Sequence, residues 1–281
     1  MSAPPGTREI RLWIPKPPNG ASQSVQLISV ESPLPYEIAS EPEFGNETVF
    51  LRAHPPVREG LEVLLRYRIT RRPQGDSFDG RRPSDIDLKA RGLLAVNDEI
   101  QQIAKDKTQG ISDSLEKGRS LYKYVLSRMA YDKSGEGWGR GDSIYACRIG
   151  KGNCTDFHSL FMALAMASGI PARFHMGFSL PEESQGAIGG YHCWAEFYTE
   201  KTGWVPVDIS EAWKNPKRAE YYFGHLDTRR VLVSTGRDIR LSPPQKGPLL
   251  NFLSRPYAEA DGKPLYDIEF TRNFKEMQRS S

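Results

Sequence analysis

The sequence has few cysteines and no long apolar stretch. Its 281 residues include only three cysteines, Cys147, Cys154 and Cys193, which excludes a disulfide framework and leaves at least one free thiol. No apolar run is long enough to span a bilayer. Residues 1–6 are polar and proline-rich and show no secretion signal, although a chain cut just after such a signal would look the same. The sequence therefore does not decide the cellular compartment. The protein is periplasmic or secreted if an export signal was removed, and cytoplasmic otherwise.

Charge of one sign is not concentrated anywhere in the chain. Lys and Arg number 38 against 35 Asp and Glu, and the formal net charge is only +3. The two signs are interleaved, whereas a nucleic-acid-binding surface would gather its basic residues, so we expect no nucleic-acid partner. With 38% hydrophobic and 26% charged residues the composition is globular, and the length predicts two domains. The sequence does not indicate an oligomeric state.

The first part of the chain is predicted to be β-rich. Apolar and polar residues alternate over 61–70 and 9–14, as in strands with one buried face, and shorter strands are expected near 25–27 and 49–51. Prolines between these runs exclude long helices. Short strands at this spacing predict a small β-sandwich domain over residues 1–75, and residues 71–84 have the composition of a linker.

The remaining residues, 76–281, are predicted to form an α+β domain with a β-rich C-terminal extension. Helices are expected over 93–105, from Asp113 onward, and from Cys154 to Gly169, with residues 131–152 as a loop. Strands are expected over 172–178, 191–198, 203–209, 230–234 and 265–270. Because helices come first and strands second, the fold class is α+β rather than a doubly wound sheet.

Cys154 stands at the start of the most apolar of these helices. The first N–H groups of a helix are unpaired and carry partial positive charge, which favours a thiolate over a thiol. A thiolate is a nucleophile, and it requires a base with an orienting partner to complete a covalent catalytic site. His192 and Asp208, which lie much further along the chain, supply these two groups.

The spacing of two predicted strands brings His192 and Asp208 together. His192, Trp194 and Glu196 share one strand face, and Trp204, Pro206 and Asp208 share a face of the next strand. A hairpin loop of three residues sets position 192 opposite 208, and one of five residues sets it opposite 210 with 208 on the diagonal. In both registers the carboxylate can hold the imidazole, and the apolar helix that carries Cys154 is expected to pack on this sheet.

Other residues of the same chemical types are less suited to this chemistry. Cys193 points to the strand face opposite His192, which favours simple packing. His158 lies one helical turn after Cys154, where a structural or substrate-lining role is favoured because no carboxylate partner is evident. Glu196 competes with Asp208 for the imidazole and ranks below it. A zinc site is disfavoured because Cys147 and Cys154 are too far apart for paired ligands and no Cys-x-x-Cys occurs.

In combination these motifs resemble the transglutaminase-like superfamily, in its prokaryotic branch. The motifs are Gly-x-Cys-x-Asp opening a helix, Tyr-His-x-Trp-x-Glu on a strand, and Gly-Trp-x-x-x-Asp on its neighbour, within residues 112–209. Three flanking stretches are also similar to bacterial members: Leu12-Trp13-Ile14-Pro15, Tyr221-Tyr222-Phe223-Gly224-His225-Leu226-Asp227 and Gly236-Arg237-Asp238.

The resemblance implies a papain-like α+β catalytic core and thiol-dependent acyl transfer on amides of a protein or peptide substrate. It assigns the catalytic triad to Cys154, His192 and Asp208, and it suggests the Trp138 indole as a side-chain donor to the oxyanion beside the Cys154 N–H. The calcium sites of the animal enzymes do not carry over because no acidic loop is present, so no cofactor or metal is expected. Hydrolysis, as by a cysteine peptidase or amidase, is preferred. A true transglutaminase that forms Gln–Lys cross-links and a catalytically silent binding module remain the alternatives.

Overall fold

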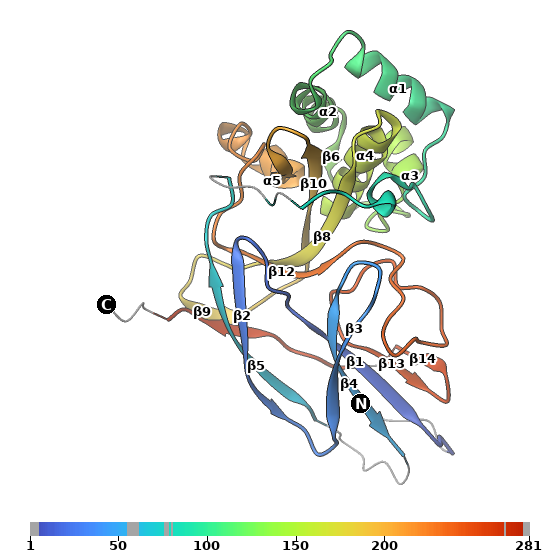
Figure 1. Cartoon of the computed structure of the whole chain (residues 1–281), viewed down its shortest axis with the longest axis vertical. Helices are drawn as coiled ribbons and strands as arrows, with labels where there is room; N and C mark the ends of the chain where they lie inside the picture. Colours follow the sequence, from blue (N-terminus) through green and yellow to red (C-terminus); the bar gives the residue numbers. More distant parts are fainter. Residues whose placement is uncertain (1–5, 55–61, 76–78, 80, 267, 278–281) are drawn as a thin grey trace. The chain divides into compact units, whose positions relative to one another are not determined.

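The computed structural model describes residues 6–54, 62–75, 79, 81–266 and 268–277, and it divides the chain into two compact units (Figure 1). Unit 1 comprises residues 1–71, 176–191 and 229–281, and unit 2 comprises residues 72–175 and 192–228. Two consecutive domains, 1–75 and 76–281, are expected from the sequence. In the structure the division is discontinuous, because the chain returns twice to the β-rich unit after entering the helical one.

The core of unit 1 is an antiparallel five-stranded sheet with the order β14-β13-β1-β4-β3. Its central strand β1 pairs with β4 through Leu12↔Leu51 and with β13 through Leu12↔Ala258. The return of the chain to unit 1 therefore supplies two strands of this sheet. The strands are β1 (Ile10–Lys16), β3 (Tyr36–Ser40), β4 (Glu47–Ala53), β13 (Tyr257–Ala260) and β14 (Lys263–Leu265).

Both faces of this sheet are covered. On one face Trp13 and Phe50 pack with residues 239–253, and the Trp13 indole donates to the Pro243 carbonyl over 3.0 Å. On the other face Leu12 and Leu51 pack against side chains of the two-stranded sheet β2 (Gln23–Glu31) and β5 (Leu64–Arg71). The predicted alternation is confirmed in β5, where half-buried and exposed residues alternate, but the single buried face predicted for residues 9–14 is wrong, because Arg11 and Trp13 of β1 are buried as well.

Unit 1 also contains the segment that leads into His192. β9 (Gln185–Ala187) pairs with β15 (Asn273–Lys275), near the end of the chain. The second half of β8 (Ala172–Ser179) belongs to this unit too, next to β12 (Arg230–Thr235), and Phe178 packs there with Val231 and Val233.

Unit 2 is built around one buried helix. α4 (Cys154–Ala167) is buried at every residue from Cys154 to Ala165, and it contacts α1, α2, α3 and β10. It ends before Gly169, whose φ of +74° is a left-handed conformation that suits glycine. The other helices are η1 (Asp85–Leu88), α1 (Asp98–Thr108), α2 (Ser114–Arg128), α3 (Ser143–Ile149), α5 (Ile209–Lys214) and η2 (Pro216–Arg218). As predicted, Asp113 caps the N-terminus of α2.

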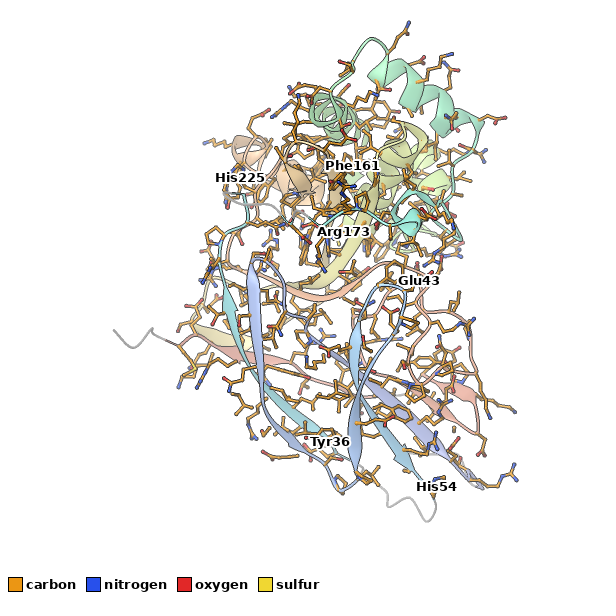
Figure 2. All side chains as sticks on the ribbon, in the orientation of Figure 1. Tyr36, Glu43, His54, Phe161, Arg173 and His225 are labelled. Carbon is orange, nitrogen blue, oxygen red and sulfur yellow. The ribbon has the colours of Figure 1, made fainter. Side chains whose placement is uncertain are left out.

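The strands of unit 2 carry the polar residues of interest. β10 (His192–Thr199) pairs antiparallel with β11 (Gly203–Val207), and the first half of β8 lies on the other side of β10. The ring of Phe161 on α4, which Figure 2 labels, lies against Phe197 of β10 with centroids 5.8 Å apart. A short parallel pair, β6 (Ala130–Tyr131) and β7 (Lys151–Gly152), precedes α4. Among the residues described, no helix is both long and apolar enough to cross a membrane.

Three predicted elements differ from the structure. Residues 131–152 were predicted as a loop, yet they contain α3, which Asp142 caps. The strand predicted over 203–209 ends at Val207 because Asp208 begins α5 instead. The strand predicted over 265–270 is absent from the described residues of that range beyond Leu265. In the first two cases a polar cap starts a helix where the apolar pattern is weak.

A buried ionic cluster joins β8 and β10 in unit 2. Glu196 is 3% exposed and accepts hydrogen bonds from Gln74 over 2.6 Å and from the Arg173 Nε over 2.7 Å. The His175 Nε2 lies 2.9 Å from the same carboxylate, and Arg173, which Figure 2 labels, also donates to Asp79 over 3.0 Å. Burial alone would raise the pKa of Glu196, but the charges of Arg173 and His175 and their hydrogen bonds outweigh it and hold that pKa well below its usual range.

Replacing Glu196 by Gln should therefore destabilise the protein in a pH-dependent way. The folded protein keeps this carboxylate ionised where the unfolded chain, with a glutamate pKa of about 4.3, already binds a proton. Its stabilisation is thus complete above that pH and declines as the pH falls below it. We expect Glu196→Gln to lower the free energy of unfolding by about 3 kcal/mol at neutral pH. The difference should shrink in acid.

Urea denaturation at several pH values measures this effect. Glu200→Gln, in the exposed turn between β10 and β11, is the matched control and should change the stability little. A pH-independent loss in Glu196→Gln would contradict the electrostatic explanation.

Candidate active site

Cys154 is the first residue of α4, as the sequence predicted. The Asn153 side chain caps the helix by accepting from the Thr155 N–H over 2.9 Å, and Asp156 accepts from the Asn153 N–H over 2.9 Å. The Asn153 side chain also accepts from the Asp156 N–H, and this bond and the one from the Asn153 N–H to Asp156 form a capping box, which fixes the path of the backbone through Cys154. The thiol is 2% exposed and lies at the positive end of the helix dipole.

Asp156 also ties a glycine-rich loop to this helix end. Its carboxylate accepts from the Gly139 N–H over 2.6 Å and from the Gly141 N–H over 3.1 Å. Burial raises the pKa of Asp156 despite these donors, and the charge of Cys154 acts in the same direction. Nothing in the local sequence pattern indicates that residues 139–141 return to Asp156.

His192 and Asp208 meet as the hairpin argument predicted. The His192 Nε2 lies 2.7 Å from the Asp208 Oδ2, and both side chains are buried. The strand pairing joins Thr199 to Gly203 and Ala195 to Val207. Extended by three residues, this register puts position 192 opposite 210 and Asp208 on the diagonal. We had linked that register to a five-residue loop, but pairing continues to Thr199 and leaves only residues 200–202 unpaired.

Asp208 has a second role that the sequence analysis missed. It is the N-cap of α5, and its Oδ1 accepts from the Glu211 N–H over 3.1 Å and from the Ser210 hydroxyl over 3.2 Å. Its own N–H donates to the Tyr222 carbonyl over 3.1 Å. The stretch Tyr221–Asp227, singled out in the sequence, thus supports the backbone of Asp208. The carboxylate cannot rotate away from His192 without uncapping α5.

Cys154 and His192 are close enough for each to shift the pKa of the other. Hydrogen bonds from Cys193 and His192 and the positive charge of His192 lower the pKa of Cys154 well below its ordinary value, although burial opposes them. Burial would lower the pKa of His192, but the charge and hydrogen bond of Asp208 and the contact with Cys154 raise it to about 9. Because the Nε2 faces Asp208, the Nδ1 of His192 is the ring nitrogen left for the sulfur.

His158 is a structural bridge rather than a second base. Its Nδ1 lies 2.7 Å from the Cys154 carbonyl oxygen, and its Nε2 accepts from the Ile209 N–H over 3.0 Å. These two bonds require a neutral ring with the proton on Nδ1. Burial lowers the pKa of His158, which keeps the ring neutral. The imidazole thus joins the first turn of α4 to the start of α5.

The remaining sequence candidates lie near this centre in other roles. Glu196 binds His175 and Arg173, so it does not compete for His192. Trp194 stacks between the two imidazoles, with centroids 5.8 Å from His175 and 6.4 Å from His192. The Glu196–His175 pair was not predicted, because the sequence placed both residues on strands without pairing those two strands.

Aromatic side chains flank the centre on the side of β6. Tyr131 lies between Phe157 and Trp213, with centroids 6.2 and 6.4 Å away, and the Lys133 ammonium lies 5.9 Å from the Trp138 ring. Burial and the charge of Cys154 raise the pKa of Tyr131. In the part of the chain that the structure describes, no group of three or more His, Cys, Asp or Glu side chains is placed to hold a metal ion.

The contact between Gly152 and Asp156 gives a prediction for the site. A Cβ at Gly152 would overlap the Asp156 carboxylate, so Gly152→Ala must displace the group that fixes the start of α4. We expect about a 10²-fold loss of Cys154 reactivity, because small misplacements of reacting groups are costly. Gly20→Ala is the control, since a Cβ there meets nothing within 4 Å. Alkylation of Cys154 by iodoacetamide measures both variants, and an unchanged rate in Gly152→Ala would contradict the proposed role of the clamp.

Comparisons with known proteins show the family of this chain. The family model of the transglutaminase-like superfamily matches residues 101–209, which include all three candidate residues. An uncharacterised protein of Haemophilus influenzae is 30% identical over a 321-residue alignment that covers 96% of this chain and 86% of that protein. The uncharacterised protein YebA of Bacillus subtilis is 24% identical over an alignment that covers 66% of this chain. The same alignment covers only 26% of YebA.

A solved structure shares the fold over nearly the whole chain. It is that of a candidate cysteine protease from Cytophaga hutchinsonii, with a TM-score of 0.56 and 14% identity. The match covers 98% of this chain and 88% of the other. The predicted α+β class with a transglutaminase-like core is thereby confirmed. The chain belongs to the transglutaminase-like superfamily, a family of thiol-dependent acyl transfer.

Proposed function

We propose that this protein is a cysteine amidase or peptidase that hydrolyses an amide bond of a protein or peptide through Cys154. The observation that carries the proposal is the continuous line of side-chain contacts from Asp208 through His192 to Cys154. The depressed pKa of Cys154 and the raised pKa of His192 favour the charged pair at neutral pH. Such a pair is ready to attack without a preceding proton transfer.

In the proposed reaction the Cys154 thiolate attacks the substrate carbonyl carbon. The C–N bond breaks as His192 gives its proton to the leaving amine, and a thioester remains on Cys154. His192 then takes a proton from water, whose oxygen attacks the thioester. The acid leaves and the thiolate–imidazolium pair is restored. Asp208 holds the imidazole in the orientation that serves both steps.

The developing oxyanion requires hydrogen-bond donors. The N–H of Cys154 at the start of α4 is one, and we propose the Trp138 indole as the other, because Asp156 ties the adjoining Gly139 to the same helix end. Water is the preferred acceptor of the acyl group, since cross-linking also requires a dedicated site for a lysine amine.

Three measurements test this function together. An electrophilic amide should label Cys154 alone, as mapped by mass spectrometry, and Cys154→Ala should remove all turnover with little change in melting temperature. Cys147→Ala, on α3, is the matched control with retained turnover. Substantial turnover in Cys154→Ala would reject the assignment of Cys154 as the nucleophile.

With a glutamine peptide and a fluorescent amine, we expect ammonia release to exceed amine incorporation, and the reverse result would indicate a transglutaminase.

Asp208→Asn separates the orienting role from the folding role. An Asn side chain can still cap α5, but it presents no negative charge to His192. We expect a fall in kcat of about 10³–10⁴-fold, with a melting temperature close to that of the unaltered protein. Near-normal turnover would show that the carboxylate does not act through His192.

A further inference from the structure

The indole of Trp194 lies against the ring of the proposed base. His192 begins β10 and Trp194 is the second residue after it, so the two side chains share one face of the strand. Their ring centroids are 6.4 Å apart and their planes are 27° from parallel, as in an offset-stacked pair. Both side chains are buried, and Trp194 is only 2% exposed. The imidazole of His192 therefore has a flat, buried surface beside it.

The indole is itself held in place from β8. The His175 ring stacks on Trp194 with centroids 5.8 Å apart and planes 24° from parallel. The His175 Nε2 lies 2.9 Å from the Glu196 carboxylate, which also accepts from Gln74 and Arg173. All of these side chains belong to unit 2. The buried ionic cluster thus fixes His175, and the His175 ring limits the tilt of the indole.

The bond from His192 to Asp208 does not by itself set the plane of the imidazole. It fixes the Nε2 at 2.7 Å from the Asp208 Oδ2, but a ring held only at Cβ and Nε2 can turn about the line that joins those atoms. The torsion of a histidine ring about its Cβ–Cγ bond is broad, so the side chain has little preference of its own. Such a turn leaves the Nε2 beside Asp208 and swings the Nδ1, the nitrogen left for the sulfur, out of position.

We propose that Trp194 is a positioning residue for the proposed reaction: by stacking on His192 it fixes the plane of the imidazole and so directs the Nδ1 toward Cys154. The inference rests on the proposed function, because it takes His192 as the base that serves Cys154. Trp194 is buried, so it acts through His192 rather than on the substrate. Asp208 then sets where the ring lies, and Trp194 sets which way its second nitrogen points.

The test is the pH dependence of Cys154 alkylation by iodoacetamide, with the labelled peptide mapped by mass spectrometry. Trp194→Leu and Trp194→Met remove the flat ring, whereas Trp194→Phe keeps one in a side chain close to theirs in volume. In the first two variants we expect the midpoint to rise by about one pH unit, which makes alkylation roughly tenfold slower below both midpoints. Above both midpoints the thiolate forms in every variant and the rates should agree. Trp194→Phe should keep the midpoint of the unaltered protein.

The charged and titratable groups around the two reacting residues are common to all these variants. They are Asp208 before α5, His158 and Asp156 on α4, Cys193 and Glu196 on β10, Arg173 and His175 on β8, and Tyr131 on β6. Trp13→Leu is the control for loss of a buried indole, because Trp13 lies in the core of unit 1. It should lower the melting temperature and leave the midpoint of Cys154 unchanged.

The outcomes separate positioning of the ring from packing. An unshifted midpoint in folded Trp194→Leu or Trp194→Met would overturn the proposal. An equal shift in Trp194→Phe or in Trp13→Leu would also reject it, because lost packing would then explain the effect. Nuclear Overhauser contacts between the His192 and Trp194 rings need no variant, and their absence from the unaltered protein would contradict the stack.

Failure of the proposed function gives a different result. Ordinary thiol reactivity of Cys154 in the unaltered protein would overturn that function itself. An activated Cys154 whose midpoint ignores the loss of the Trp194 ring would overturn only this inference.

Discussion

The carboxylate of Asp208 makes two interactions at once, and the arrangement of the site depends on both. One oxygen caps α5 and the other holds His192, so the fold of the β11–α5 junction and the orientation of the imidazole are one constraint. The carboxylate is buried, and its charge raises the pKa of His192. A charged imidazole next to the sulfur in turn favours the thiolate, because opposite charges in a buried site attract strongly.

The helix that carries the sulfur brings this interaction into position. α4 is buried along most of its length, so its N-terminus can lie only where β10 and the loop at Gly139–Gly141 leave room. Asp156 fixes that loop, and His158 links the first turn of α4 to Ile209 beside Asp208. Polar contacts within unit 2 thus hold the sulfur and the carboxylate on either side of His192. In this arrangement the buried polar groups orient the site rather than fill a core.

Much of this site could be predicted from the sequence, because period-two strands and a helix N-terminus are local patterns. Cys154 at a helix start and His192 near Asp208 follow from such patterns and from a short hairpin. The cap that Asp208 forms could not be predicted, since residues 209–214 show no helical apolar periodicity that would indicate α5. The discontinuous division of the chain was missed as well. Strand β13 pairs with β1 across more than 240 residues of sequence, and no local pattern encodes such a pairing.

The charge state of His192 tests this account most directly. Nuclear magnetic resonance of the ¹⁵N-labelled imidazole ring reports protonation at each nitrogen as the pH is raised. We expect an imidazolium throughout the neutral range, with loss of the proton near pH 9 and a lower midpoint when Cys154 is replaced by alanine. A ring that titrates near the ordinary histidine value of about 6.5, with or without the sulfur, would contradict the thiolate–imidazolium pair.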